Sequence, residues 1–565
     1  MAKRKATAKQ FSLGVDYGTN SVRAVIVDIS DGREIASSTF NYPSGVDGIL
    51  LDDKDPNLAR QNPTDYLVGF EKSVRAAVRA AAKKRGFAPN RIVCIGIDAT
   101  GSTPIPVNRD GVALGATPRF QNNLDAQAWL WKDHTAHAEA AEITEKAANA
   151  DADYLAKCGG TYSSEWYWSK MLHCRRVAPH VFKAAYSWVE QSDFIPAHLT
   201  GNTQPDKMAR NACAAGHKAM YHEQWGGVPS REFLASLSPD LAVHRDRYSP
   251  AAVTSDHAAG HLTADIAEKA GLPARIPVAV GIIDAHAGAV GAGVRPGALV
   301  KVLGTSTCDM MVAPMRHPLN DIDGLCGIVP GSIVPGMYGL EAGQSAVGDL
   351  FNWFAGHLSP PAFAKGDTHA NLTAAAAKLK PGQSGLLALD WNNGNRCILV
   401  DPLLAGLLVG QTLHTTAPEI YRALIEATAF GALTIINQFE SGGVKVRQVI
   451  NCGGVAEKNP LLMQIYADVC NRPMKISGSS ETCALGAAIF GSVVGGAHQS
   501  VQAAQKRMTR LATREYHPNR QAAAVYRQLF TLYTQLHDCF GTTEYRGNLH
   551  AVMKQLINLR NTVRQ

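Results

Sequence analysis

A short motif of glycine and threonine occurs twice in this chain, once near the start and once about halfway along. The first copy contains Gly18, Thr19 and Asn20, and the second contains Gly304 and Thr305. Apolar, strand-like residues flank both copies, which predicts two tight hairpin turns. Such a turn can present N–H and O–H donors to a phosphate group. A single copy would most simply be an ordinary hairpin, but two copies predict that two similar domains hold one nucleotide between them.

The two copies differ in one acidic residue. Only the first has a carboxylate, Asp16, at the end of its leading strand. Mg²⁺ bound to proteins keeps several waters and takes few carboxylate ligands. We therefore predict that Asp16 holds the water shell of a Mg²⁺ ion, in a single metal–nucleotide site at the interface of the two domains.

A second glycine motif lies in the C-terminal half. Gly453 and Gly454 follow the strand-like run 447–451, and we expect residues 452–458 to form a loop. Adjacent glycines let a flat ring such as adenine approach the backbone. Asn459 would either bond to the nucleotide or cap the helix that begins at Pro460. The small residues of 484–491 indicate close helix packing at least as well as a ligand contact.

The candidate general base is Asp284, which follows the apolar strand-like run 277–283. A carboxylate at the end of a strand could take the proton of an attacking alcohol. It could equally cap the following helix, and position alone favours neither interpretation. The second hairpin lies one connection further along, so Asp284 would face the phosphates, and this favours the role of base.

Length and composition predict a two-domain protein inside the cell. The chain has 565 residues, 46% of them hydrophobic, and a net charge of +7. This length exceeds what one core usually organises. No run approaches the roughly 18 apolar residues of a membrane span. The eleven cysteines are scattered without metal-ligand spacing, which is typical of reduced thiols and predicts a cytoplasmic location. Residues 1–10 are basic, and we expect a disordered tail without the apolar segment of a signal peptide.

Strand-like and helical patterns alternate along the chain, which predicts an α/β fold with mixed sheets. We expect an N-terminal domain over 11–290 and a C-terminal, nucleotide-binding domain over 291–565, with the crossover in 288–297. The expected strands and the two long helices are Phe11–Val15, Ser21–Ile29, Ile92–Ile97, Val278–Ile283, Ala298–Val302, Gln448–Asn451 and Met474–Ile476, with helices Pro63–Lys84 and Pro418–Phe439.

Together these motifs resemble those of the FGGY carbohydrate kinases, a family with two ribonuclease H-like domains and a cleft between them, as in actin and hexokinase. Longer segments resemble the members that phosphorylate ribulose. These segments are 96–103, 130–134, 162–166, 215–219, 339–346 and 389–396.

The resemblance implies ATP-dependent phosphorylation of L-ribulose, with D-ribulose as a second substrate, at the 5-hydroxyl in arabinose degradation. Asp284 would be the base and would also contact the sugar. Gly101, Trp131, Lys218 and Glu341 would line the sugar site, and 11–290 would be the sugar-binding domain. Without the resemblance, Trp131 would most simply be a core residue and Lys218 a surface lysine.

Two alternatives stay open at this stage. The chain could phosphorylate another ketose or polyol, such as xylulose or ribitol, since one epimeric hydroxyl changes only one or two hydrogen bonds. It could also be a non-catalytic, actin-like sensor of sugar or nucleotide. We expect a small-molecule sugar and MgATP as partners, with no nucleic acid and no membrane, and the sequence leaves a homodimer open.

Overall fold

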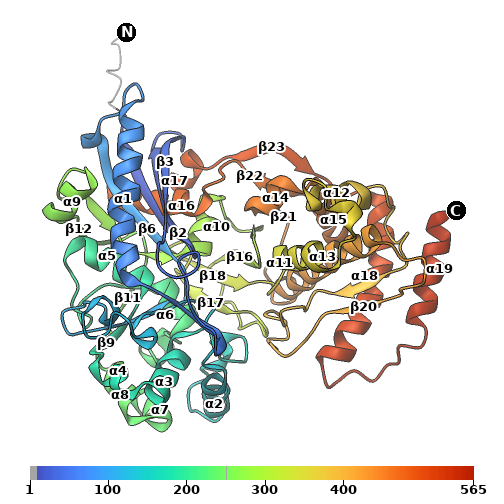
Figure 1. Ribbon diagram of the computed structural model, residues 1–565, viewed down its shortest axis with the longest axis horizontal. Helices are drawn as coiled ribbons and strands as arrows, with labels where there is room; N and C mark the ends of the chain where they lie inside the picture. The colour runs from blue at the N-terminus through green and yellow to red at the C-terminus, as the bar shows by residue number, and fades with distance from the viewer. Residues whose placement is uncertain (1–8, 250) are drawn as a thin grey trace.

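The computed structural model describes residues 9–249 and 251–565 and consists of two lobes, each built on a seven-stranded sheet (Figure 1). The strands of the first sheet, in spatial order, are β12 (Ala258–His261), β13 (Pro277–Ala279), β6 (Ile92–Ala99), β1 (Phe11–Tyr17), β2 (Ser21–Asp28) and β3 (Glu34–Asn41), with β14 (Ile282–Ile283) also on β6. Those of the second are β17 (Gly327–Pro330), β18 (Met337–Ala342), β16 (Thr307–Pro314), β15 (Ala298–Leu303), β21 (Gln448–Cys452), β22 (Met474–Ser477) and β23 (Leu511–Tyr516).

The two sheets share the same central connectivity. β1 pairs antiparallel with β2 and parallel with β6. In the second sheet, β15 pairs antiparallel with β16 and parallel with β21. Each antiparallel pair closes at a glycine–threonine turn, as predicted. The predicted fold class, two ribonuclease H-like domains of mixed α/β structure, is confirmed.

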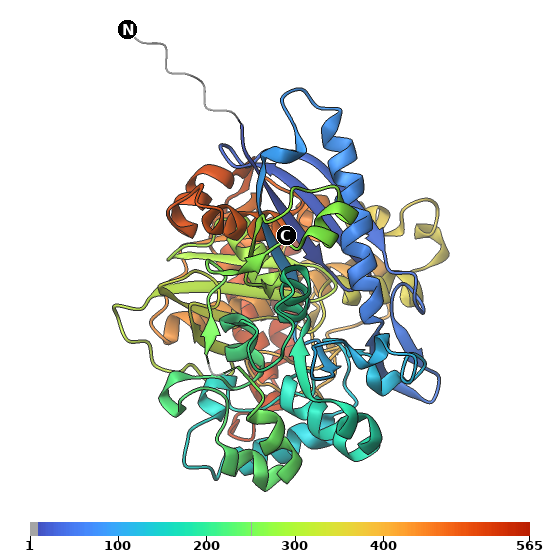
Figure 2. The same ribbon diagram turned by 90° about the vertical axis from the view of Figure 1, so that its left-hand side faces the viewer.

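Helices cover both faces of the first sheet. α1 (Pro63–Ala82), α5 (Gln191–Thr200) and α9 (Ala264–Ala270) share one core with its strands. α10 (Asp284–Gly291), α16 (Thr482–Val494) and α17 (Val501–Met508) share a second core that also includes strands β15 and β16. Figure 2 shows α1 and the orange-red C-terminal helices on opposite sides of the blue strands. The helices α10 and α16 thus join the two lobes.

Helix α16 packs very closely on the first sheet. A Cβ atom added to Gly14 would lie 1.9 Å from the carbonyl oxygen of Ala484, and one added to Gly96 would lie 1.7 Å from that of Ala487. Only glycine permits this approach. The small residues of 484–491 therefore serve helix packing, which was one of the two interpretations of that run.

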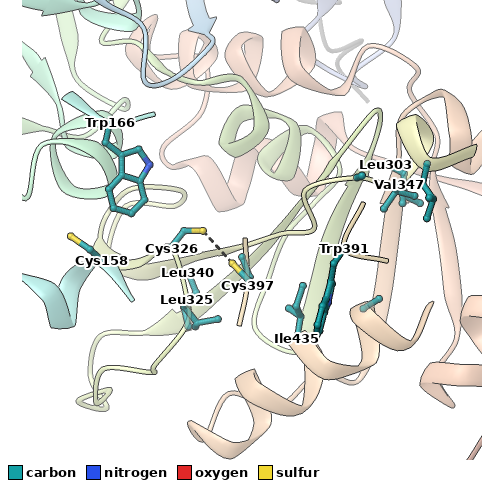
Figure 3. Packing of buried hydrophobic residues seen from close by; sticks show 14 of the residues in the cluster. Cys158, Trp166, Leu303, Leu325, Cys326, Leu340, Val347, Trp391, Cys397 and Ile435 are labelled. Carbon is teal, nitrogen blue, oxygen red and sulfur yellow. Dashed lines mark hydrogen bonds between the residues drawn. The ribbon is translucent and has the colours of Figure 1, made fainter. Parts of the chain in front are cut away.

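The far face of the second sheet packs against α13 (Ala417–Ser441), α15 (Pro460–Cys470) and α18 (Arg520–Gly541). Side chains alternate between the two faces, as the pleat requires: Leu299 and Leu303 of β15 point into this core, and Val300 points to the other. Figure 3 shows part of this core, including the thiols of Cys326 and Cys397, which face each other with their sulfurs 3.3 Å apart.

The remaining elements extend the two lobes. Small sheets pair β4 (Leu50–Asp52), β5 (Asp55–Gln61) and β8 (Ala128–Trp129); β7 (Pro104–Val107) and β9 (Ser187–Glu190); β10 (Arg210–Asn211) and β11 (Ala252–Val253); and β19 (Leu387–Leu389) and β20 (Leu407–Val409). The other helices are α2 (His137–Ala147), α3 (Tyr167–Val177), α4 (Pro179–Ala184), α6 (Ala212–Lys218), α7 (Arg231–Leu237), α8 (Pro239–Arg245), α11 (Gly348–Trp353), α12 (Thr368–Ala376), α14 (Gly454–Lys458) and α19 (Val552–Arg564).

Three predicted segments differ from the structure. The run Val278–Ile283 is broken into β13 and β14, because five residues on it (Val278 to Ile282) lie opposite only four on β6 (Ile95 to Asp98). The predicted loop 452–458 contains the short helix α14, whose buried Ala456 anchors it. Helix α10 occupies the first part of the predicted crossover, which leaves 292–297 as the connection to β15.

Most of the predicted basic tail lies outside the described residues. Lys9, which belongs to it, is described and pairs with the buried carboxylate of Asp28 at 3.1 Å. Among the helices in the described ranges, none combines the length and apolar character needed to cross a bilayer.

Candidate active site

Three carboxylates lie at the carboxyl ends of adjacent strands of the first sheet. Asp16 near the end of β1 is in register with Asp98 on the neighbouring strand β6. Asp98 is in turn the partner of Ile282 on β14, and Asp284 follows two residues later. The ends of parallel strands form one edge of a sheet, so the topology gathers these acids from distant parts of the chain.

Asp284 is the first residue of α10, and Ile283 is the N-cap residue of that helix. The Oδ1 atom of Asp284 accepts a hydrogen bond from the N–H of Ala285 at 2.6 Å. Burial and, next, the negative charge of Asp16 raise the pKa of Asp284 to about 7. A carboxylate with this pKa is suited to accept a proton near neutral pH. The chemistry of the position therefore favours a base over a mere helix cap.

Asp98 is fully buried, and neither of its oxygens has a hydrogen-bond partner among the described residues. Burial and then the charge of Asp16 raise the pKa of Asp98 well above its ordinary value. Burial likewise raises the pKa of Asp16. A pair of crowded, buried carboxyl groups fits a site for a hydrated Mg²⁺ ion, so the residues present agree with the predicted role of Asp16.

A buried ion pair lies near Asp284, whose pKa its two charges influence. The Nζ atom of Lys218, at the end of α6, lies 2.9 Å from Oε1 and 3.1 Å from Oε2 of Glu341 on β18. Burial alone would raise the pKa of Glu341, but the charge and hydrogen bond of Lys218, together with the two neighbouring histidines, lower the pKa to about 2. Lys218 is thus a buried, paired residue and not a surface lysine.

Two histidines lie next to Glu341. The Nδ1 atom of His217 and the Nε2 atom of His286 lie 3.4 and 3.5 Å from Oε2 of Glu341. Burial lowers the pKa of His286 to about 4 and that of His217 well below its ordinary value, so both rings are neutral at neutral pH. Lys218 therefore supplies the positive charge at this carboxylate.

Gly101 and Trp131 belong to the same region. A Cβ atom on Gly101 would lie 2.7 Å from a side-chain carbon of Ile283, directly before Asp284. The indole N–H of Trp131 donates to the hydroxyl of Thr19 at 3.0 Å. One predicted sugar residue thus adjoins the base, and the other touches the first hairpin.

Each glycine–threonine turn is closed by the N–H of its glycine, although the second turn is one residue shorter. The N–H of Gly18 donates to the carbonyl of Ser21 at 2.9 Å, and the N–H of Gly304 donates to that of Ser306 at 3.0 Å. These two glycine N–H groups are committed within the turns. A phosphate would therefore be met by the N–H and O–H groups of the threonines that follow them.

The predicted adenine contacts adjoin the second turn. Gly453 has φ +94°, and a Cβ atom there would lie 2.4 Å from the carbonyl oxygen of Leu303, so only glycine fits. The space in front of Gly454 is open. Asn459 caps α15 by accepting from the N–H of Leu462 at 3.0 Å, so its side-chain oxygen is occupied.

The side-chain amide of Asn20 already has a hydrogen-bond partner. It donates to the carbonyl of Asp47 at 2.7 Å. Asn20 therefore fixes the loop beside the first turn with its side chain and could reach a phosphate through its backbone N–H.

The sequence interpretation missed two residues that shape the site. Asp98 lies in the segment 96–103, to which the sequence analysis assigns no catalytic or metal-binding role. Its position at the end of an apolar strand, like that of Asp16, is a signal that could have identified it. The buried ammonium of Lys170 donates to the carbonyls of Ser102, Trp129 and Leu130, and so braces the segments next to Gly101 and Trp131. A lysine among aromatic residues in Tyr167–Leu172 was the only hint of it.

Two family models match this chain. Residues 11–291 match the N-terminal domain of the FGGY family of carbohydrate kinases, and residues 299–494 match its C-terminal domain. The ribulokinase of Shouchella clausii is 40% identical to this chain, over 98% of each protein. The ribulokinase of Mycolicibacterium smegmatis is 39% identical over the same shares.

Solved structures share the fold at lower identity. A xylulose kinase from Rhodospirillum rubrum matches with a TM-score of 0.75 at 22% identity, over 94% of this chain and 99% of that one. The glycerol kinase of Plasmodium falciparum with ADP matches with a TM-score of 0.74 at 15% identity, over the same shares.

Proposed function

Because this chain belongs to the FGGY family of carbohydrate kinases, we propose that it transfers the γ-phosphoryl group of ATP to the 5-hydroxyl of L-ribulose, and of D-ribulose as a second substrate, in arabinose degradation. Identity of 35–40% over nearly the whole chain with ribulokinases supports ribulose as the sugar. The observation that carries the chemistry is Asp284, a carboxylate with a pKa of about 7 beside the Lys218–Glu341 ion pair.

In the proposed mechanism the sugar lies between Trp131 and the Lys218–Glu341 pair. Charged partners orient a small polyol through its hydroxyl and keto groups, and an indole face covers its C–H side. Gly101 leaves room beside Ile283 for the sugar to approach Asp284. Asp284 then accepts the proton of the 5-hydroxyl as its oxygen attacks the γ-phosphorus in line.

The nucleotide is proposed to lie across the two turns. Thr19 and Thr305 would donate to the β- and γ-phosphates, and Gly453 and Gly454 would lie under the adenine. When bound, Mg²⁺ would offset the charge on the phosphate oxygens, and Asp16 would hold its water shell. Asn459 contributes by capping α15 and so fixes the loop that carries the two glycines.

ADP release tests this proposal directly. We would compare L-ribulose, D-ribulose, L-xylulose, D-xylulose, ribitol and glycerol with MgATP, for the wild type and for Asp284→Ala. We expect fastest turnover with L-ribulose and its collapse in the variant. Turnover with another sugar would keep the mechanism and change the substrate. A folded sample that binds ATP and releases no ADP with any sugar would contradict the proposal and favour a sensor.

We also propose a cytoplasmic location, which the need for ATP and the eleven free cysteines support. Absence of nucleic-acid binding stays a prediction, and a homodimer stays open.

A further inference from the structure

Two segments with different proposed ligands touch each other in this structure. Trp131, of the proposed sugar site, donates its indole N–H to Oγ1 of Thr19 at the tip of the first hairpin, at 3.0 Å. An indole nitrogen can only donate, so the Thr19 oxygen is the acceptor. A hydroxyl has one proton and two lone pairs, and the proton of Thr19 thus stays available for a phosphate oxygen.

A second hydrogen bond holds the same residue. The side-chain amide of Gln61, at the end of β5, donates to the backbone carbonyl of Thr19 at 2.6 Å. Gln61 is fully buried, and its own carbonyl oxygen accepts from the hydroxyl of Tyr66 at 2.7 Å, which fixes the orientation of the amide.

Both donors come from one small sheet. Gln61 pairs with Ala128 across β5 and β8, and Trp131 is the second residue beyond the end of β8. Asp133 joins the two segments again by accepting from the N–H of Ala59 at 2.7 Å. Trp131 and Gln61 therefore reach Thr19 from one hydrogen-bonded unit.

We propose that Trp131 and Gln61 act as positioning residues for Thr19, so that Trp131, a residue of the proposed sugar site, also influences the affinity for the phosphates of the nucleotide. We call the two hydrogen bonds from Trp131 and Gln61 to Thr19 the Thr19 clasp. The inference rests on the proposed function for the identity of the two ligands. The indole N–H holds the Thr19 oxygen from one side and leaves its proton directed to the phosphate. Because a neutral hydrogen bond contributes modestly, its loss should weaken nucleotide binding about threefold to tenfold.

A double-mutant cycle tests the clasp without any sugar. The probe is the Mg²⁺ complex of a non-hydrolysable ATP analogue, and its dissociation constant is measured by titration calorimetry. Trp131→Phe keeps the aromatic wall and removes only the N–H, and Thr19→Val removes the hydroxyl at nearly constant volume. We expect Trp131→Phe to weaken binding threefold to tenfold in the wild type and to have no further effect on Thr19→Val.

A matched control is available in the chain. The indole N–H of Trp225 donates to the carbonyl of Met220 at 2.9 Å, so Trp225→Phe is the same substitution with loss of a similar bond. It should leave the dissociation constant unchanged. If Thr19→Val fails to fold, Thr19→Ala takes its place. Gln61→Met should weaken nucleotide binding in the same direction.

The proposal is overturned if Trp131→Phe leaves nucleotide affinity intact, or if it weakens binding by the same factor with and without the Thr19 hydroxyl. Because the readout is nucleotide binding alone, a protein that failed to phosphorylate ribulose would contradict the proposed function and leave this test valid.

Discussion

Replacement of Asp284 by asparagine separates the role of this carboxyl in catalysis from its effect on stability. The substitution keeps the size of the side chain and removes its charge and its capacity to accept a proton. Loss of a positioned base costs roughly 10²- to 10⁴-fold in rate. We therefore expect kcat of Asp284→Asn to fall by that factor, while the KM for MgATP changes little.

The stability of the variant should change in the opposite direction. The pKa of Asp284 rises from 3.8 to about 7 in the folded protein. As pH increases from 3.8 to about 7, the unfolded chain ionises first, and the folded state loses stability over that window. The difference corresponds to at most about 4 kcal/mol. Above pH 7 the asparagine variant avoids this loss and should have the larger free energy of unfolding.

Two assays decide the matter. ADP release at saturating MgATP and L-ribulose gives kcat, and for the wild type kcat/KM should rise with pH and level off above about pH 7. Denaturant unfolding at pH 5 and pH 8 gives the stability difference. The reasoning is refuted if Asp284→Asn keeps more than a tenth of the wild-type kcat, or if it is less stable than the wild type at pH 8.

Three further changes test the rest of the site. Glu341→Gln leaves the Lys218 ammonium buried without an anion. Denaturant unfolding should therefore show a free energy of unfolding lower by about 3–5 kcal/mol, and the KM for the sugar should rise while the KM for ATP stays unchanged. An unchanged KM for the sugar would exclude Glu341 from the sugar site. Asp98→Asn removes a buried carboxyl with a raised pKa, so the decline of unfolding free energy from pH 5 to pH 8 should become smaller than in the wild type; an identical pH dependence would contradict its position. EDTA should abolish turnover. In a Mg²⁺ titration, Asp16→Asn should raise the Mg²⁺ concentration for half-maximal rate about tenfold to a hundredfold. An equal Mg²⁺ requirement in the variant and the wild type would exclude Asp16 as a metal residue.

Local patterns predicted most of the fold. Apolar runs between turn residues predict the central strands of both sheets. The structure adds a capping box at the start of α13, formed by Thr416 and Glu419. Errors arose where tertiary contacts overrode the pattern. The run 277–283 has the pattern of one strand, but its register against β6 changes between Val278 and Ile282. Gly281 lies in this interval, and a Cβ atom there would lie 1.9 Å from the carbonyl oxygen of Ser192.

The site was only partly predictable for a related reason. Asp284 and Asp16 could be found because each ends a strand beside a recognisable turn. The role of Asp98 depends on the order of strands in the sheet, which places it beside Asp16. The role of Lys170 depends on hydrogen bonds to three carbonyls on other segments. Contacts between distant segments have no local signal in one sequence.

The position of α16 has a consequence for how the protein is made. This helix covers one face of the N-terminal sheet, yet its residues are among the last hundred to leave the ribosome. During synthesis the strands that carry Gly14 and Gly96 must wait, with an apolar face uncovered, until nearly the whole chain has emerged. A fragment that stops at residue 297 would keep that face exposed and should aggregate. The core of the N-terminal lobe is therefore completed only late in translation, when α16 has been synthesised.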